Sequence, residues 1–150
     1  EMNAVFGGWK QRADAVSAAL RGKDVAYVLV TTPDPLAIRE VRYFAERLQA
    51  ERMRVDAFVV NRKNPAFPME AEHTAAALGD IGVTSDAGLL AKCAEALRDA
   101  SRLAKMDRLH LLSLDPIVEE TNAAMVAVPT FASDVYDLEA LRQIGDILAP

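Results

Sequence analysis

The pattern of hydrophobic and polar positions divides the chain into short apolar runs and longer stretches with helical spacing. Residues 25–31 form a continuous apolar run rich in Val, and further runs occur at residues 56–60 and 124–128. A continuous run of this kind is typical of a strand that is covered on both faces, as in parallel sheets. Helical stretches stand between the runs, so we expect an α/β fold in three layers: a parallel sheet with helices on both faces.

Apolar residues recur at helical spacing in five stretches, which are predicted to form helices. Asp34 suits the N-cap of the second helix and Pro35 suits its first position. Asp134 is expected to cap the last helix, and Asp115-Pro116 to end the long helix that precedes the third strand. The helices are expected at residues 3–21, 35–51, 70–78, 86–112 and 135–148.

The apolar stripe of each of the three longer helices after the first strand is expected to face the core. Gly7 and Gly8 weaken the first turns of the N-terminal helix, so a start near Trp9 is the alternative there. The helix at 35–51 joins the first two strands in a βαβ unit, whose crossover we expect to be right-handed. The inward stripes are Ile38, Val41, Phe44, Ala45 and Leu48; Leu89, Cys93, Ala96, Leu97, Ala100, Leu103 and Ala104; and Leu138, Leu141, Ile144 and Leu148.

Three parallel strands are few for a doubly wound sheet that stands alone. Either the sheet gains strands from a partner segment, or the chain is a compact remnant of three layers. The helix at 3–21 has no strand before it, which favours a partner segment. Glu1 is not an initiator Met, so we expect a chain that is processed or cut from a longer one.

Length and composition predict a single globular domain that spans residues 1–150. The chain is 51% hydrophobic with a net charge of −5, and this acidic balance argues against general nucleic-acid binding, which needs a basic face. No run reaches the ~18 apolar residues that a membrane span needs. The single cysteine, Cys93, excludes an internal disulfide and is interpreted as a core thiol; a reduced, cytoplasmic setting is expected.

Candidate binding residues follow the ends of the three predicted strands. Asp34 follows the first, Asn61 begins an irregular loop at 61–68 after the second, and Pro129-Thr130-Phe131 follows the third. In an open parallel sheet, ligands bind beyond the carboxyl ends of the strands. The sequence therefore predicts a binding rim at this edge.

Each of these residues also has a purely structural interpretation. The Asn61 amide can read the edge of a purine, as Asn does with adenine, or it can simply tolerate a turn conformation. Pro129 ends strand pairing, which either frees backbone and an apolar wall for a flat base or makes an ordinary turn. Asp34 can accept bonds from a ribose or a neighbouring subunit's ligand, act as a helix cap, or do both.

Other chemistry finds little support in the sequence. The phosphate-binding pattern G-x-x-x-x-G-K-[ST] and the nucleophile pattern G-x-S-x-G are both absent. His73 and His110 are far apart and have no carboxylate pair at metal-ligand spacing, so no metal site is expected. Arg62 and Lys63 could meet a phosphate or form a solvated loop.

The order and spacing of these turns resemble the C-terminal half of an ArsA-type ATPase, the family of arsenite-pump and tail-anchored-protein-targeting ATPases. The shared pattern is a strand, an acid, a long helix and a strand ending in Val-Asn-[Gln/Arg], here Asp34 to Asn61-Arg62. A Val-Pro, a short turn, an acid and Leu on a helix follow, here Val128-Pro129 to Leu138. The resemblance covers residues 10–150, and it implies the C-terminal part of a P-loop NTPase, Rossmann-like fold.

The resemblance also implies roles for the candidate residues. In that family the Asn at the position of Asn61 contacts adenine, the segment at Pro129–Phe131 flanks the purine, and the acid at Asp34, usually Glu, contacts nucleotide at a dimer interface. Three features depart from the family pattern: the acid is shortened to Asp34, Tyr136-Asp137 replaces a common Arg-Gly, and the zinc-binding Cys-x-x-Cys of the targeting members is absent.

Two functions are therefore expected. The first is the ATP-binding part of an ArsA-like ATPase, providing adenine recognition and part of a homodimer or paralogous dimer face. Its partner is the N-terminal P-loop half of the same protein, through which Mg²⁺ is supplied, so the chain alone is expected to be inactive in ATP hydrolysis. The alternative is a nucleotide-free interaction module that docks a partner on the helix at 86–112.

Overall fold

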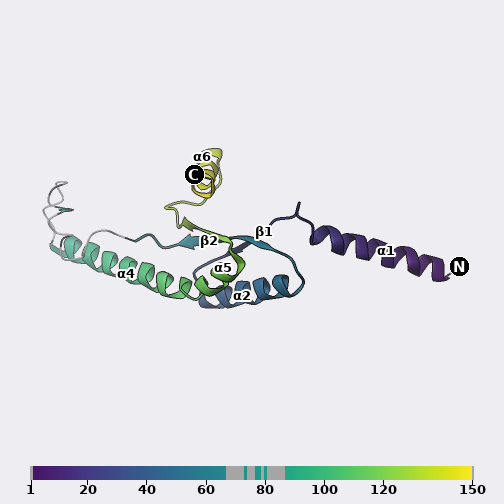
Figure 1. Ribbon diagram of the computed structural model, residues 1–150. Coiled ribbons are helices and arrows are strands. Elements are labelled where there is room, and N and C mark those ends of the chain that lie inside the picture. Colours follow the sequence, from purple (N-terminus) through teal and green to yellow (C-terminus); the bar gives the residue numbers. More distant parts are fainter. Residues whose placement is uncertain (1, 67–72, 74–76, 79, 81–86, 150) are drawn as a thin grey trace.

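The computed structural model describes residues 2–66, 73, 77, 78, 80 and 87–149, and in these residues helices stand between the strands, two of them in succession before the last strand (Figure 1). The helix expected at 70–78 falls largely outside the described residues. The elements are α1 (Met2–Leu20), β1 (Tyr27–Thr31), α2 (Pro35–Ala50), β2 (Val55–Lys63), α4 (Ala87–Leu111), α5 (Asp115–Thr121), β3 (Ala124–Pro129) and α6 (Leu138–Leu148).

The three strands form one parallel sheet in the order β1-β2-β3. Leu29 pairs with Phe58, which pairs with Met125 on the other side of β2. Because all strands run the same way, their carboxyl ends meet at one edge of the sheet. The α/β class and the parallel sheet expected from the sequence are confirmed.

The hydrophobic core lies between one face of the sheet and the helices α2, α4 and α5. Phe58 and Val60 of the central strand are fully buried, and Leu114, at the start of α5, is buried with them. The α2 helix begins where the sequence predicts, because Pro35 occupies its first turn and Asp34 caps it. The buried cluster comprises Leu29, Ile38, Val41, Ala45, Leu48, Val55, Phe58, Val60, Leu111, Leu114 and Ile117.

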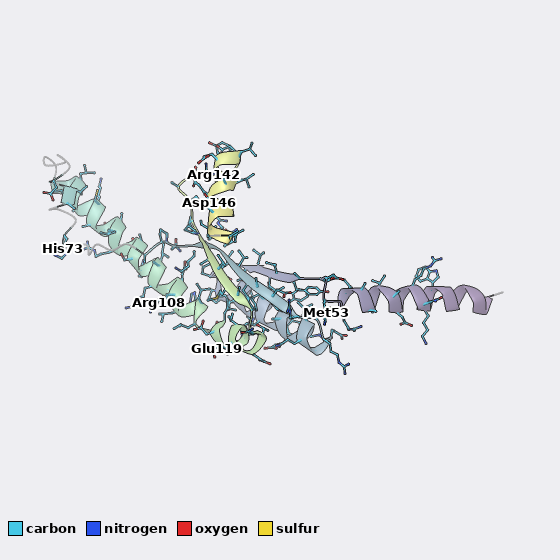
Figure 2. All side chains as sticks on the ribbon, turned by 45° about the horizontal axis from the view of Figure 1, so that its top comes forward. Met53, His73, Arg108, Glu119, Arg142 and Asp146 are labelled. Atoms are coloured by element: carbon cyan, nitrogen blue, oxygen red, sulfur yellow. The ribbon has the colours of Figure 1, made fainter. Side chains whose placement is uncertain are left out.

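The other face of the sheet is covered unevenly, and the expectation that the first strand is covered on both faces is wrong. Val28 and Val30 of β1 are 52% and 64% exposed, whereas Val128 of β3 is buried. Helix α6 contacts β3, and Figure 2 shows its Arg142 and Asp146 on the opposite side of the sheet from Glu119 of α5. Cover on this face is therefore concentrated at the β3 side.

The end of β2 and the start of α5 differ from the expectation, because strand pairing and the first turn of a helix accommodate residues that are typical of turns. The loop expected from residue 61 is wrong at its start, since β2 continues to Lys63 and pairs there with Pro129. Asp115-Pro116 does not simply end a helix; it begins α5, because proline is tolerated in a first helical turn.

The final helix begins three residues later than expected. Asp137, and not Asp134, caps α6, and its side chain accepts a hydrogen bond of 2.8 Å from the backbone N–H of Ala140. The residues before it, 130–136, form neither helix nor strand. This leaves Asp134 free to line a cavity at the end of the sheet, as described below.

Each of the three expected inward stripes contains residues that are exposed. Phe44 of α2 is half-exposed, as are Leu89 and Leu103 of α4, and Cys93 is only half-buried and so is not a fully buried core thiol. On α6, Leu138 is 84% exposed. Helix α1 projects away from the sheet (Figure 1) with Trp9 exposed. Among the described residues, no helix combines the length and apolarity needed to cross a membrane.

Replacing Phe58 and Phe44 in turn distinguishes a core position from an exposed one. We expect Phe58→Ala to lower the free energy of unfolding by about 3–5 kcal/mol, because it leaves a cavity in the core. Phe44→Ala is expected to change it by less than about 1 kcal/mol, because that ring is half in solvent. Urea unfolding followed by circular dichroism measures both; equal losses would contradict the described core.

Candidate functional site

The end of β2 carries an irregularity that turns two polar residues out of the strand pairing. Val60 pairs with Ala127 and Lys63 with Pro129, so three steps along β2 match two along β3. Arg62 adopts a left-handed backbone conformation with φ 58° at this bulge, which bends the strand end. The pairing closes beyond it, where the backbone N–H of Thr130 donates to the carbonyl of Lys63 at 2.9 Å.

A cavity of about 320 Å³ lies at this end of the sheet, between β2, β3 and α6. It brings together Asn61 and the segment Pro129–Phe131, which the sequence singled out separately. Ile144 of α6 forms part of its wall, and Asp134 belongs to its rim. The complete lining is Asn61, Arg62, Pro129, Thr130, Phe131, Ser133, Asp134, Val135 and Ile144.

The amide of Asn61 is oriented by the backbone of the next residue, Arg62. Its Oδ1 accepts a hydrogen bond of 2.9 Å from the backbone N–H of Arg62, which keeps the side chain beside the bulge. Within the described part of the chain, its Nδ2 has no hydrogen-bond partner, and the residue is exposed. Phe131 in the same cavity is half-buried, so a polar edge and an apolar surface face one space.

Asp34 lies apart from this cavity and acts as the N-cap of α2. Its Oδ1 accepts hydrogen bonds from the backbone N–H groups of Leu36 and Ala37, at 2.9 and 3.2 Å. It lines a second cavity of about 510 Å³ with Thr32, Asn64 and His110 on the α4 side of the sheet. The capping interpretation is therefore confirmed, and Asp34 does not join Asn61 and Pro129.

Arg62 is the residue that the two cavities share. It lines both the cavity of Asn61 and the cavity of Asp34, and within the described residues its guanidinium makes no hydrogen bond or ion pair. An exposed cation between two cavities at the carboxyl edge can meet an anionic ligand from either side.

Sequence reasoning missed the two residues of α4 that hold the strand ends. Asp107 is only 9% exposed, and its Oδ2 accepts hydrogen bonds from the backbone N–H and the Nδ2 of Asn64, at 2.7 and 2.9 Å. One turn on, the Nδ1 of His110 lies 3.1 Å from the carbonyl oxygen of Pro33. The signal available in the sequence was the spacing of Asp107 and His110, which at positions i and i+3 lie on one face of the helix.

Metal binding has no candidate among residues 2–66, 73, 77, 78, 80 and 87–149. No three His, Cys, Asp or Glu side chains come together there in a way that could hold a metal ion. His73 is exposed and His110 is engaged with the β1–α2 turn.

Comparison with known proteins does not assign the chain to a family: no protein-family model matches the sequence, and no curated protein matches it. The geometry of the strand ends is therefore the observation that bears on function.

Replacing Asp34 tests its capping role. We expect Asp34→Ala to lower the free energy of unfolding by about 1 kcal/mol, because the first N–H groups of α2 lose their acceptor. Asp34→Ser should retain nearly all of the stability, since a Ser hydroxyl also caps. Thermal and urea unfolding of the two variants provide the comparison, and equal stability of Asp34→Ala and the parent chain would contradict the capping role.

Proposed function

We propose that the chain is the base-binding part of an ATPase that resembles the ArsA type. The observation that carries this proposal is the shared cavity of Asn61 and Pro129–Phe131 at the carboxyl edge of the sheet. These residues are distant in sequence and meet only through the parallel pairing of β2 with β3. The edge is the place where open α/β sheets bind ligands.

The chemistry of the cavity fits a purine. The free Nδ2 of Asn61 can donate to a ring nitrogen, and its Oδ1 has a second lone pair for an exocyclic amine. Phe131 and Pro129 supply apolar surface against which a flat heterocycle packs. A volume of about 320 Å³ is at the small end of ligand pockets, which suits a base and leaves the phosphates outside.

Phosphate and Mg²⁺ binding would come from elsewhere. The sequence has no G-x-x-x-x-G-K-[ST] loop, and the described residues have no carboxylate cluster for a cation. In the proposal, a P-loop half supplies both, and this chain orients the nucleotide through its base. ATP, when bound across the two parts, would be hydrolysed by positioning and electrostatic stabilisation at its γ-phosphate.

Asp34 fits a contact with a neighbouring subunit better than one with the base. Both capping bonds end on its Oδ1, so its other carboxylate oxygen is available at an exposed position. We propose that this oxygen faces nucleotide or protein across a dimer interface, with a homodimer or a paralogous dimer as the assembly.

Titration with ADP tests base recognition directly. We expect saturable binding to the full chain by calorimetry, and about tenfold weaker binding in Asn61→Ala, because a hydrogen-bond pair to the base is lost. Asn61→Asp should weaken binding similarly, since it replaces the amide donor with an anion.

Gln143→Ala is the matched control for this titration. Gln143 is an exposed amide on α6 that does not line the cavity, so its loss should leave ADP affinity unchanged. Binding that is the same in Asn61→Ala and in the parent chain would contradict the proposed site.

The isolated chain is expected to show no ATP hydrolysis above the buffer blank. The reason is that it lacks a phosphate cradle in its sequence, and catalysis of phosphoryl transfer depends on positioning the γ-phosphate. Release of inorganic phosphate with Mg²⁺-ATP is the measurement. Turnover that persists through purification would refute the expectation that this chain alone is inactive.

The exposed apolar residues of α4 favour a second candidate function, a nucleotide-free docking module. Leu89, Leu103 and Met106 are exposed along this helix. An apolar helical face of this kind can lie in a partner's groove. Absence of ADP binding, together with self-association that depends on concentration and is lost in Leu103→Glu, would favour this module over the first proposal.

A further inference from the structure

A cavity of about 360 Å³ lies at the amino end of the sheet, opposite the end that carries Asn61. Its walls are the turn after α1, the start of β1 and the turn between α2 and β2. Met53, in the last of these turns, lies where α1 joins the sheet (Figure 2). The complete lining is Leu20, Arg21, Gly22, Lys23, Val25, Tyr27, Arg52 and Arg54.

Contacts within this chain hold the three walls together. The Tyr27 hydroxyl donates a hydrogen bond of 3.1 Å to the carbonyl of Leu20, which fixes the turn after α1 against β1. The Nε of Arg21 donates one of 2.6 Å to the carbonyl of Glu51, which fixes the same turn against the end of α2. Tyr27 itself pairs with Val55 of β2. The cavity therefore forms without any strand on the outer edge of β1.

The cavity is lined by cations, although the chain as a whole is acidic. Four of its lining residues are Arg or Lys and none is Asp or Glu, whereas the net charge of the chain is −5. Two of the arginines are ion-paired with carboxylates outside the lining: Arg21 with Glu51 at 3.0 Å, and Arg54 with Asp56. These pairs orient the two guanidinium groups and neutralise them.

The other two cations, Lys23 and Arg52, keep their charge available. Within the described residues their side chains make no hydrogen bond or ion pair, and they belong to different walls of the cavity. Helices α1 and α2 end beside it, and each helix end carries a partial negative charge of about half a unit. Two full positive charges exceed these two partial charges, so the cavity favours an anion.

Arg52 occupies a backbone position where glycine is the usual residue. Its φ is 60°, its N–H donates to the carbonyl of Gln49, and the N–H of Met53 donates to the carbonyl of Leu48, each at 2.8 Å. These bonds form the Schellman motif at the end of α2, in which the left-handed residue is most often Gly. An arginine there costs stability and contributes a charge, and such strain is concentrated at ligand sites.

We propose that this cavity binds a small molecule that carries two linked phosphate groups. Lys23 and Arg52 supply the unneutralised charge, and the half-buried side chains of Val25 and Tyr27 offer an apolar wall to the rest of the molecule. Guanidinium groups match the oxygens of phosphate, and the volume is at the small end of ligand pockets. The acidic chain as a whole repels a nucleic acid. The inference does not depend on the binding of a base at Asn61.

The probe is inorganic pyrophosphate, titrated calorimetrically into the full chain without Mg²⁺ or nucleotide. We expect saturable binding that weakens as NaCl is raised, since salt screens exposed charges. Malonate, which carries two carboxylates, should bind at least about tenfold more weakly, because it has fewer oxygens and less charge. Equal affinity for malonate would overturn the assignment to phosphates.

Replacing Arg52 separates ligand binding from stability. Arg52→Gly should weaken pyrophosphate binding about tenfold, because an unpaired cation is lost. The same change should raise the urea midpoint, because glycine adopts a positive φ without strain. Arg39→Ala is the matched control: Arg39 is an exposed cation of α2 outside the cavity, and its loss should leave affinity unchanged.

Lys23 is tested in the same way. Lys23→Ala should weaken pyrophosphate binding about fivefold, because the second unpaired cation is lost. Lys10→Ala, an exposed cation on α1 outside the cavity, should not weaken it. Asn61→Ala should also retain the parent's affinity, because Asn61 lies at the other end of the sheet.

Competition by ADP in the Asn61→Ala variant identifies the source of the diphosphate. Displacement of pyrophosphate there would mean that the cavity takes the diphosphate of a nucleotide, and no displacement would mean a diphosphate compound without a base; both results agree with the proposal. It would be overturned by the absence of saturable pyrophosphate binding, by equal affinity in Arg52→Gly and the parent chain, or by an equal loss in Arg39→Ala.

Discussion

Parallel pairing of β2 on both of its sides is the interaction on which the rest of the structure depends. Phe58 and Val60 of this strand are fully buried against α2 and α5, and its partners β1 and β3 have no other strand neighbour among the described residues. The common direction of the strands gathers three polar ends at one edge. Asn61 and Pro129 therefore meet, although they are distant in sequence.

The same pairing leaves one face of the sheet partly uncovered. Cover on the α6 face lies beside β3, where the cavity of Asn61 and Pro129–Phe131 forms, and is missing over Val28 and Val30 of β1. Asn61 lines both this cavity and the open groove of about 560 Å³ between β1 and α2. Two residues of α4 contact the strand ends: Asp107 accepts hydrogen bonds from Asn64, and His110 lies against the carbonyl of Pro33.

The sequence predicted the parts of the fold that depend on local chemistry. The α2 helix starts at Pro35 because Asp34 caps it, and the three strands lie at the apolar runs. It did not predict the bulge at Arg62, the start of α5 at Asp115 or the cap at Asp137, because each depends on pairing or on competition between nearby caps. The sequence also did not predict that Val30 and Leu138 are exposed. An apolar pattern shows which residues tend to be buried, but not whether another element covers them.

Hydrogen exchange of the backbone amides in the free chain tests the central claim that β2 alone is paired on both sides. The account predicts that the amides of Phe58–Val60 exchange slowest, and that the outward-facing amides of β1 exchange far faster, since they have no strand partner. Protection throughout Tyr27–Thr31 equal to that of Phe58–Val60 in the monomer would contradict it, because the outer edge of β1 would then already be paired.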